Sequence, residues 1–221
     1  MKYVFALVTF LAITIAACSN KELPAESQIK GYLAAKDFNT FVGLYVSLND
    51  GKYDPSKLAS VAYGIEYEHG DPFSKREAED KIKKIAEEES TKLKGQYNVM
   101  VSGSWLGLQE YNFERKGFEI KNLLKLEPEK DLEKKFSGRQ KLVLPGRFQI
   151  DVNDETIARS IQKPARTLSP EDLKANIYCR ATKAEIKHEI FSAIALTCEP
   201  TKIHIKLGDQ DFGIFDVSEI K

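Results

Sequence analysis

The sequence contains few of the residues from which catalytic and metal sites are usually built. Its 221 residues include three cysteines, three histidines and one tryptophan, and 33 basic residues balance 33 acidic ones. A chain without a basic excess has no electrostatic footprint for nucleic acid, so we expect no nucleic-acid partner. The sequence has no His-x-x-x-His pair for a metal and no Gly-x-Ser-x-Gly turn for a catalytic serine. It therefore predicts no catalytic residue, no metal ligand and no cofactor.

The first eighteen residues carry the clearest pattern in the chain. Lys2 precedes residues 4–17, which are apolar except for two threonines, and the run closes on Ile15-Ala16-Ala17-Cys18. This run is shorter than the roughly 20 apolar residues that a membrane-spanning helix needs. A basic start, an apolar centre and small residues before a cleavage point are typical of a secretory signal.

The end of this segment closely resembles the lipobox of bacterial lipoproteins. In that family a signal peptidase cuts before the cysteine, which carries a diacylglycerol thioether and an acylated amino group. The resemblance implies that residues 1–17 are a signal peptide, that Cys18 is the lipid-attachment residue and that residues 18–24 form a lipidated tether. Ser19 stands where many inner-membrane lipoproteins carry Asp, which implies an outer-membrane location facing the periplasm. The alternative is an ordinary signal peptide followed by a chance cysteine.

The other two cysteines form an even pair once Cys18 is lipidated. Residues 175–187 and 189–199 alternate like β-strands. A hairpin turning at His188 and Glu189 would place Cys179 directly opposite Cys198. Because the envelope oxidises thiols, we predict a disulfide between them, worth about 3 kcal/mol by loop-closure entropy. Two unlinked buried thiols are the alternative.

Residues 25–95 have the apolar spacing of helices. Helical spacing runs over residues 29–48, and Asp54 followed by Pro55 is typical of a helix start. Ser74 and a glutamate three residues later form a capping box that predicts a long charged helix to about residue 94. The second helix has an apolar stripe at i, i+3, i+4 and i+7, formed by Leu58, Val61, Ala62 and Ile65.

From residue 96 onward the apolar period changes to 2, which is typical of strands. We predict a mostly antiparallel β-sheet or sandwich over residues 96–221, with a helical insertion at residues 153–162 and a loop or exposed helix at 127–140. Helices followed by strands indicate the α+β class. This order also resembles uncharacterised bacterial lipoproteins of unknown function, a resemblance that transfers no site residue.

One cluster of potential ligands stands out, namely Glu66, Glu68, His69 and Asp71. It could bind a metal or act in acid–base chemistry. A structural interpretation explains every member, however, because His69 fits a helix C-terminus and Asp71 fits the start of the next turn. We favour the structural interpretation.

The remaining candidates are two histidines and a group of aromatics. The alternation around His204 places it on the solvent face of a strand, and His188 falls at the predicted turn. Trp105, Tyr111 and Phe113 would share one face if they lay on a continuous strand. Such a row can stack on a sugar or peptide, although it is more often half of a core.

Together these features predict a lipid-anchored cell-envelope protein that acts as a non-enzymatic binding or interaction module. Its partners would be the membrane, through lipidated Cys18, and an unknown envelope protein or wall component contacted through the β-rich half. The alternative is an envelope hydrolase or an enzyme inhibitor whose site residues converge only in three dimensions.

Overall fold

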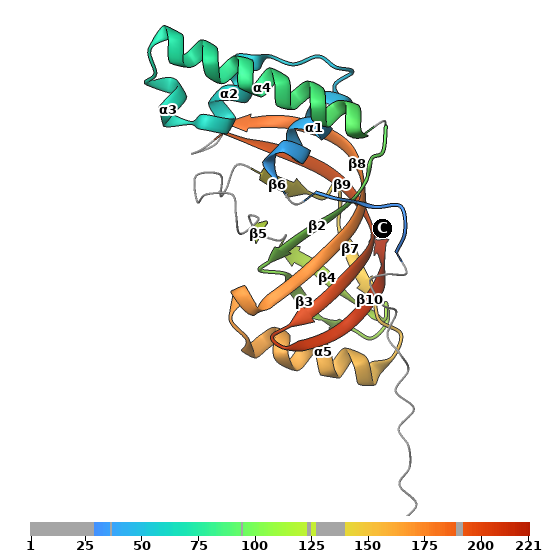
Figure 1. Cartoon of the computed structure of the whole chain (residues 1–221). Helices are drawn as coiled ribbons and strands as arrows, with labels where there is room; N and C mark the ends of the chain where they lie inside the picture. The colour runs from blue at the N-terminus through green and yellow to red at the C-terminus, as the bar shows by residue number, and fades with distance from the viewer. Residues whose placement is uncertain (1–28, 36, 94, 123–124, 127–139, 189–191) are drawn as a thin grey trace, which may run out of the picture.

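The computed structural model describes residues 29–35, 37–93, 95–122, 125–126, 140–188 and 192–221 (Figure 1). The predicted signal peptide, Cys18 and the tether lie outside these residues, as do most of the predicted 127–140 loop and Glu189 of the predicted turn. Four helices precede the main strands, and a mostly antiparallel sheet follows from Asn98. The α+β prediction is confirmed.

Acidic residues begin three of the helices by accepting hydrogen bonds from backbone N–H groups. Asp54 accepts from Ser56 and Lys57 with Pro55 in the first turn, as predicted, and Asp37 and Asp154 cap two other helices in the same way. The helices are α1 (Phe38–Leu48), α2 (Pro55–Tyr63), α3 (Ile65–Glu68), α4 (Pro72–Leu93) and α5 (Glu155–Thr167), with a short 3-10 turn at Pro170–Asp172.

Two helix predictions were wrong at their starts. The chain at Leu33–Ala34 forms strand β1 rather than helix, because it pairs in parallel with the sheet edge, where the Ala35 N–H donates to the Met100 carbonyl at 2.9 Å. Helix α4 begins at Pro72 rather than Ser74, because the Asp71 carboxylate accepts from the N–H groups of the next turn at 2.8 and 3.1 Å. Asp71 therefore outcompetes Ser74 as the cap.

The described strands form one ten-stranded sheet in the order β1-β2-β8-β9-β10-β7-β4-β3, with β5 paired to β2 and β6 paired to β9. All pairs are antiparallel except β1–β2 and β6–β9. The strands are β1 (Leu33–Ala34), β2 (Asn98–Ser104), β3 (Gly107–Asn112), β4 (Gly117–Asn122), β5 (Lys125–Leu126), β6 (Gln140–Val143), β7 (Phe148–Asp151), β8 (Leu173–His188), β9 (Ser192–Leu207) and β10 (Gln210–Glu219).

The hairpin of β8 and β9 is the longest element of the sheet and joins its two ends. Its proximal half is flanked by β2 and β10, while its distal half pairs with β6 and packs against α1 and α2. In Figure 1 the helices α1–α4 lie over the distal half, and α5 lies near the opposite end of the molecule. One apolar core nevertheless runs through both parts, from α1 to β10.

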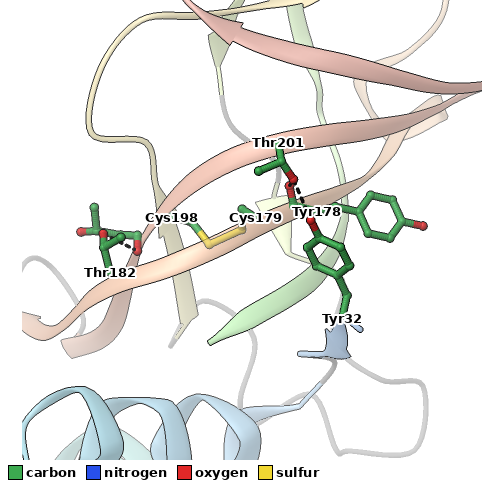
Figure 2. The surroundings of a disulfide bond; sticks show 7 residues. Tyr32, Tyr178, Cys179, Thr182, Cys198 and Thr201 are labelled. Atoms are coloured by element: carbon green, nitrogen blue, oxygen red, sulfur yellow. Dashed lines mark hydrogen bonds between the residues drawn. A yellow bond between two sulfur atoms is a disulfide. The ribbon is translucent and has the colours of Figure 1, made fainter. Parts of the chain in front are cut away.

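A disulfide joins Cys179 to Cys198 across this hairpin, with a Cα–Cα distance of 5.6 Å, and confirms the predicted pairing (Figure 2). The predicted register was wrong, because Cys179 lies opposite Pro200 and Cys198 lies opposite Ala181. The pairing shifts on either side of the cysteines, including an extra residue at Thr182. The disulfide is therefore diagonal rather than directly cross-strand.

Candidate binding surface

The α3–α4 corner, defined here as residues 63–81, carries the most exposed large apolar side chains in the described part of the chain. Phe73 is 87% exposed and Ile65 is 67% exposed. Figure 1 places this corner at the far end of the helical layer. The sequence pattern had assigned Ile65 to the buried stripe of the preceding helix, and this was wrong. Leu58, Val61 and Ala62 of that stripe are buried as predicted.

The backbone of the corner explains why Ile65 leaves the stripe. Gly64 adopts a positive φ of 54°, which ends α2 and turns the chain before α3. Gly70 then passes so close to α3 that an added Cβ would lie 3.0 Å from the Glu66 carbonyl oxygen. The glycine before Ile65 was the sequence signal that could have predicted this break.

Asp71 fixes the entry into α4 and with it the position of Phe73. Its carboxylate accepts from the Ser74 hydroxyl at 2.8 Å and from the N–H groups of Phe73 and Ser74. The hydrogen bond from the Ser74 side chain, followed by those from the backbone, lowers the pKa of Asp71 below its usual range. Phe73 therefore occupies a well-defined helical turn although its ring is in solvent.

A pocket of about 250 Å³ opens at the corner between the α2–α3 turn and α4. The Tyr67 hydroxyl donates to Glu79 at 2.6 Å, and burial followed by this hydrogen bond raises the pKa of Tyr67 to about 12. The Lys75 ammonium lies 5.8 Å from the centre of the Tyr67 ring. The pocket is lined by Tyr63, Glu66, Tyr67, Ser74, Glu77, Ala78 and Lys81.

The predicted ligand cluster belongs to the same corner, but its members have different roles. The His69 N–H closes the end of α3 by donating to the Ile65 carbonyl, and Asp71 caps α4, whereas Glu66 lines the pocket. Within the described ranges, no group of three or more His, Cys, Asp or Glu residues is arranged to hold a metal ion.

A second pocket, of about 260 Å³, lies in the β-rich half between α5 and the β3–β4 hairpin. Leu108 and Phe118 contribute apolar surface, and an ion pair between Arg166 of α5 and Glu110 of β3 crosses between its two walls. The remaining lining residues are Gln109, Lys121, Gln162 and Ala165.

The aromatic row expected near this pocket is not a continuous face. Trp105 has a positive φ of 69° and separates β2 from β3. Tyr111 is buried, and its hydroxyl donates to the Val152 carbonyl at 2.8 Å, so it belongs to the core. Phe113 is 64% exposed and packs edge-on against Tyr111 with ring centres 5.1 Å apart. Trp105 is 43% exposed.

His204 is buried, and the prediction of a solvent-facing side chain was wrong. Only 4% of the residue is exposed, and its Nε2 lies 2.8 Å from the Asp211 carboxylate. A register shift between Asp211 and Gly213 brings this carboxylate back over the strand. Burial raises the pKa of Asp211, but hydrogen bonds from His204 and the Gly213 N–H outweigh it and lower the pKa overall.

His188 ends β8 beside the predicted turn, and its Nδ1 lies 2.8 Å from the Ser192 hydroxyl. A serine and a histidine at this distance could in principle form a nucleophile and base. The pair is exposed at the end of the hairpin and lines neither pocket described above. Its geometry is that of a cross-strand contact.

Comparisons with known proteins give no assignment. No family model, no curated protein and no solved structure matches this chain. Among the described helices, none combines the length and the apolar character that crossing a membrane requires. The function must therefore be inferred from the surfaces described above.

Proposed function

We propose that this chain is a lipid-anchored protein of the bacterial cell envelope, attached through Cys18 and facing the periplasm from the outer membrane. Its activity is the binding of another protein through the α3–α4 corner rather than catalysis. The observation that carries this proposal is the exposure of Phe73 and Ile65 on the same corner, at 87% and 67%.

Exposure of this kind is unusual for side chains of this size. Burying a phenylalanine or isoleucine contributes roughly 1.5–3 kcal/mol, and single exposed cases are ordinary. Two such residues beside a tyrosine-lined pocket are typical of an interaction site. Aromatic residues seated in such pockets often dominate binding energy.

The position of the corner also supports a protein partner. The first described residues lie near the C-terminal end of α4, where the Gln96 side chain donates to the Gly31 carbonyl at 3.0 Å. The corner lies at the other end of this 22-residue helix, about 33 Å away at 1.5 Å per residue. The corner is thus held well away from the point where a tether from Cys18 enters the fold.

The pocket of the β-rich half supports binding less strongly. Its two walls are already connected by the ion pair between Arg166 and Glu110. Lys121 and Gln162 also line it, but Phe118 at its base is only 1% exposed and offers almost no ring surface for stacking. We therefore place the binding surface on the helical part instead of the β-rich half.

The anchor is tested by the Cys18→Ser variant expressed with its signal peptide. Loss of the thiol blocks lipid attachment, so the variant should accumulate as a precursor or fractionate as a soluble protein. The wild-type chain should remain with the membranes after a salt wash. A variant that stays in the membrane fraction and migrates like the wild type would contradict the anchor.

The binding surface is tested by photocrosslinking in cells, with p-benzoylphenylalanine in place of Phe73. The expected result is one discrete crosslinked species that disappears when Ile65→Glu is added. The matched control places the same crosslinker at Phe113, an exposed aromatic at the other end of the molecule. Equal crosslinking from both positions, or persistence in the presence of Ile65→Glu, would contradict a specific corner site.

A further inference from the structure

We infer that the pocket of the α3–α4 corner receives an arginine side chain of the partner, whose neighbouring apolar residues pack against Phe73 and Ile65. This inference rests on the proposed function and specifies the chemistry of the same site. Ile65 precedes Glu66 and Phe73 precedes Ser74, so each exposed apolar residue is adjacent in sequence to a residue that lines the pocket.

The charge of the corner favours a basic partner. The whole chain is balanced, with 33 basic and 33 acidic residues, but residues 63–81 contain six carboxylates and three cationic side chains. Glu66 and Glu77 line the pocket itself, and the Lys81 ammonium lies 2.9 Å from Glu77. Complementary charge at an interface selects partners and speeds association.

The aromatic walls favour a guanidinium in particular. Tyr63 and Tyr67 both line the pocket, and the Lys75 ammonium already lies within cation–π range of the Tyr67 ring. The hydrogen bond to Glu79 holds Tyr67 in place, so little side-chain freedom remains to be lost on binding. A planar guanidinium can stack on such a ring and still donate to carboxylates, which an ammonium cannot do as well.

The size of the pocket fits one side chain. At about 250 Å³ it is smaller than the cavities of roughly 300–1,000 Å³ that hold drug-sized ligands. A membrane surface is a poorer occupant, because anionic headgroups would face the net negative charge of the corner. A segment with one arginine between apolar residues satisfies the pocket and the two flanking side chains together.

The test compares two peptides that differ only in charge, acetyl-Leu-Arg-Phe-Leu-amide and its citrulline analogue. Each is titrated into the mature full-length chain in detergent, and binding is followed by the NMR signals of labelled tyrosines. The arginine peptide should shift Tyr63 and Tyr67 and bind at least about fivefold more tightly than the citrulline peptide. Equal affinities, or shifts confined to other tyrosines, would overturn the inference.

Two variants separate pocket chemistry from general charge. Glu66→Gln combined with Glu77→Gln should remove the preference for arginine, because both carboxylates line the pocket. Glu68→Gln is the matched control, since Glu68 is exposed on the same helix but does not line the pocket, and it should retain the preference. Loss of the preference in both variants would show a diffuse charge effect and would count against the site.

The failure of this inference can be told apart from failure of the proposed function. If crosslinking at Phe73 succeeds while the two peptides bind equally, the corner binds protein but the arginine assignment is wrong. The Cys18→Ser chain is also tested for sedimentation with vesicles of phosphatidylethanolamine and phosphatidylglycerol. Sedimentation that is lost in Phe73→Glu would assign the corner to the membrane and overturn both statements.

Discussion

The two ends of helix α4 have the same charged character in sequence but opposite environments in the fold. Toward the C-terminus, Ile82 and Ala86 are fully buried and Leu93 is 5% exposed, against α1 and α2. Here α1 comes so close that a Cβ added to Gly43 would lie 2.7 Å from the Cβ of Glu89. At the N-terminal end Phe73 is 87% exposed.

This difference separates stability from recognition along one helix. The buried turns hold the helical layer on the sheet, and the exposed turns contribute surface that the fold does not use. Substitutions at the two ends should therefore have distinct effects, which the following predictions measure from the largest change in stability to the smallest.

Ile82→Ala should lower the free energy of unfolding by about 3–4 kcal/mol, because it leaves a cavity at a fully buried position. Urea unfolding followed by circular dichroism measures the effect. The crosslink from position 73 should persist under conditions where the variant remains folded. A loss below about 1 kcal/mol would mean that this end of α4 is not part of the stable core.

Replacing Cys179 and Cys198 together by alanine should cost about 3 kcal/mol, because the unfolded chain is no longer constrained by a loop across 19 residues of sequence. The measurement is urea unfolding of both proteins without reductant. Peptide mapping of the wild-type protein should recover the two cysteine peptides as one linked species. Free thiols at both positions would refute the bridge.

Asp211→Asn should have a smaller effect that depends on pH. The folded pKa of Asp211 is lowered from 3.8, so its stabilising contribution is present above that pH and is lost as the pH falls through the folded pKa. Its side chain is 54% exposed, so solvent screening limits the loss at neutral pH to below about 1 kcal/mol.

The stability gap between wild type and Asp211→Asn should therefore close when thermal unfolding is measured below pH 3.8. Asp209→Asn, at an exposed position in the same turn, provides the control and should leave stability unchanged at both pH values. A gap that widens on acidification would show that the carboxylate does not stabilise the fold in its charged form.

Phe73→Ala should change the free energy of unfolding by less than about 0.5 kcal/mol, because the ring is exposed. A loss comparable to that of Ile82→Ala would remove the contrast between the two ends of α4. The same variant should weaken partner capture, measured by crosslinking from Glu77 instead of position 73. Stability retained with capture lost is the combination that defines a binding residue.

Local signals predicted much of the fold. Asp54 and Pro55 mark the start of α2, and the change of period near residue 96 marks the passage from helices to strands. The pairing of Cys179 with Cys198 was also predicted, since only a hairpin and an oxidising compartment were needed. These features depend on neighbours within a few residues or on one short connection.

The errors occur where distant segments decide the environment. His204 alternates like a surface residue, but Asp211 from the adjoining strand pairs with it and its neighbours bury it. The cysteine register failed because an extra residue at Thr182 cannot be recognised from alternation alone. The binding corner was missed because the spacing of Ile65 matched a helix that Gly64 had already ended.

The place of the disulfide along the β8–β9 hairpin has a consequence for how the sheet opens. Pairing of β8 with β2 ends at Arg180, next to Cys179, and pairing of β9 with β6 ends at Thr197, next to Cys198. Strand separation that starts at the His188 end can therefore spread only as far as the covalent link. Backbone amides on its two sides should exchange hydrogen with solvent in separate opening events, so the hairpin behaves as two cooperative units.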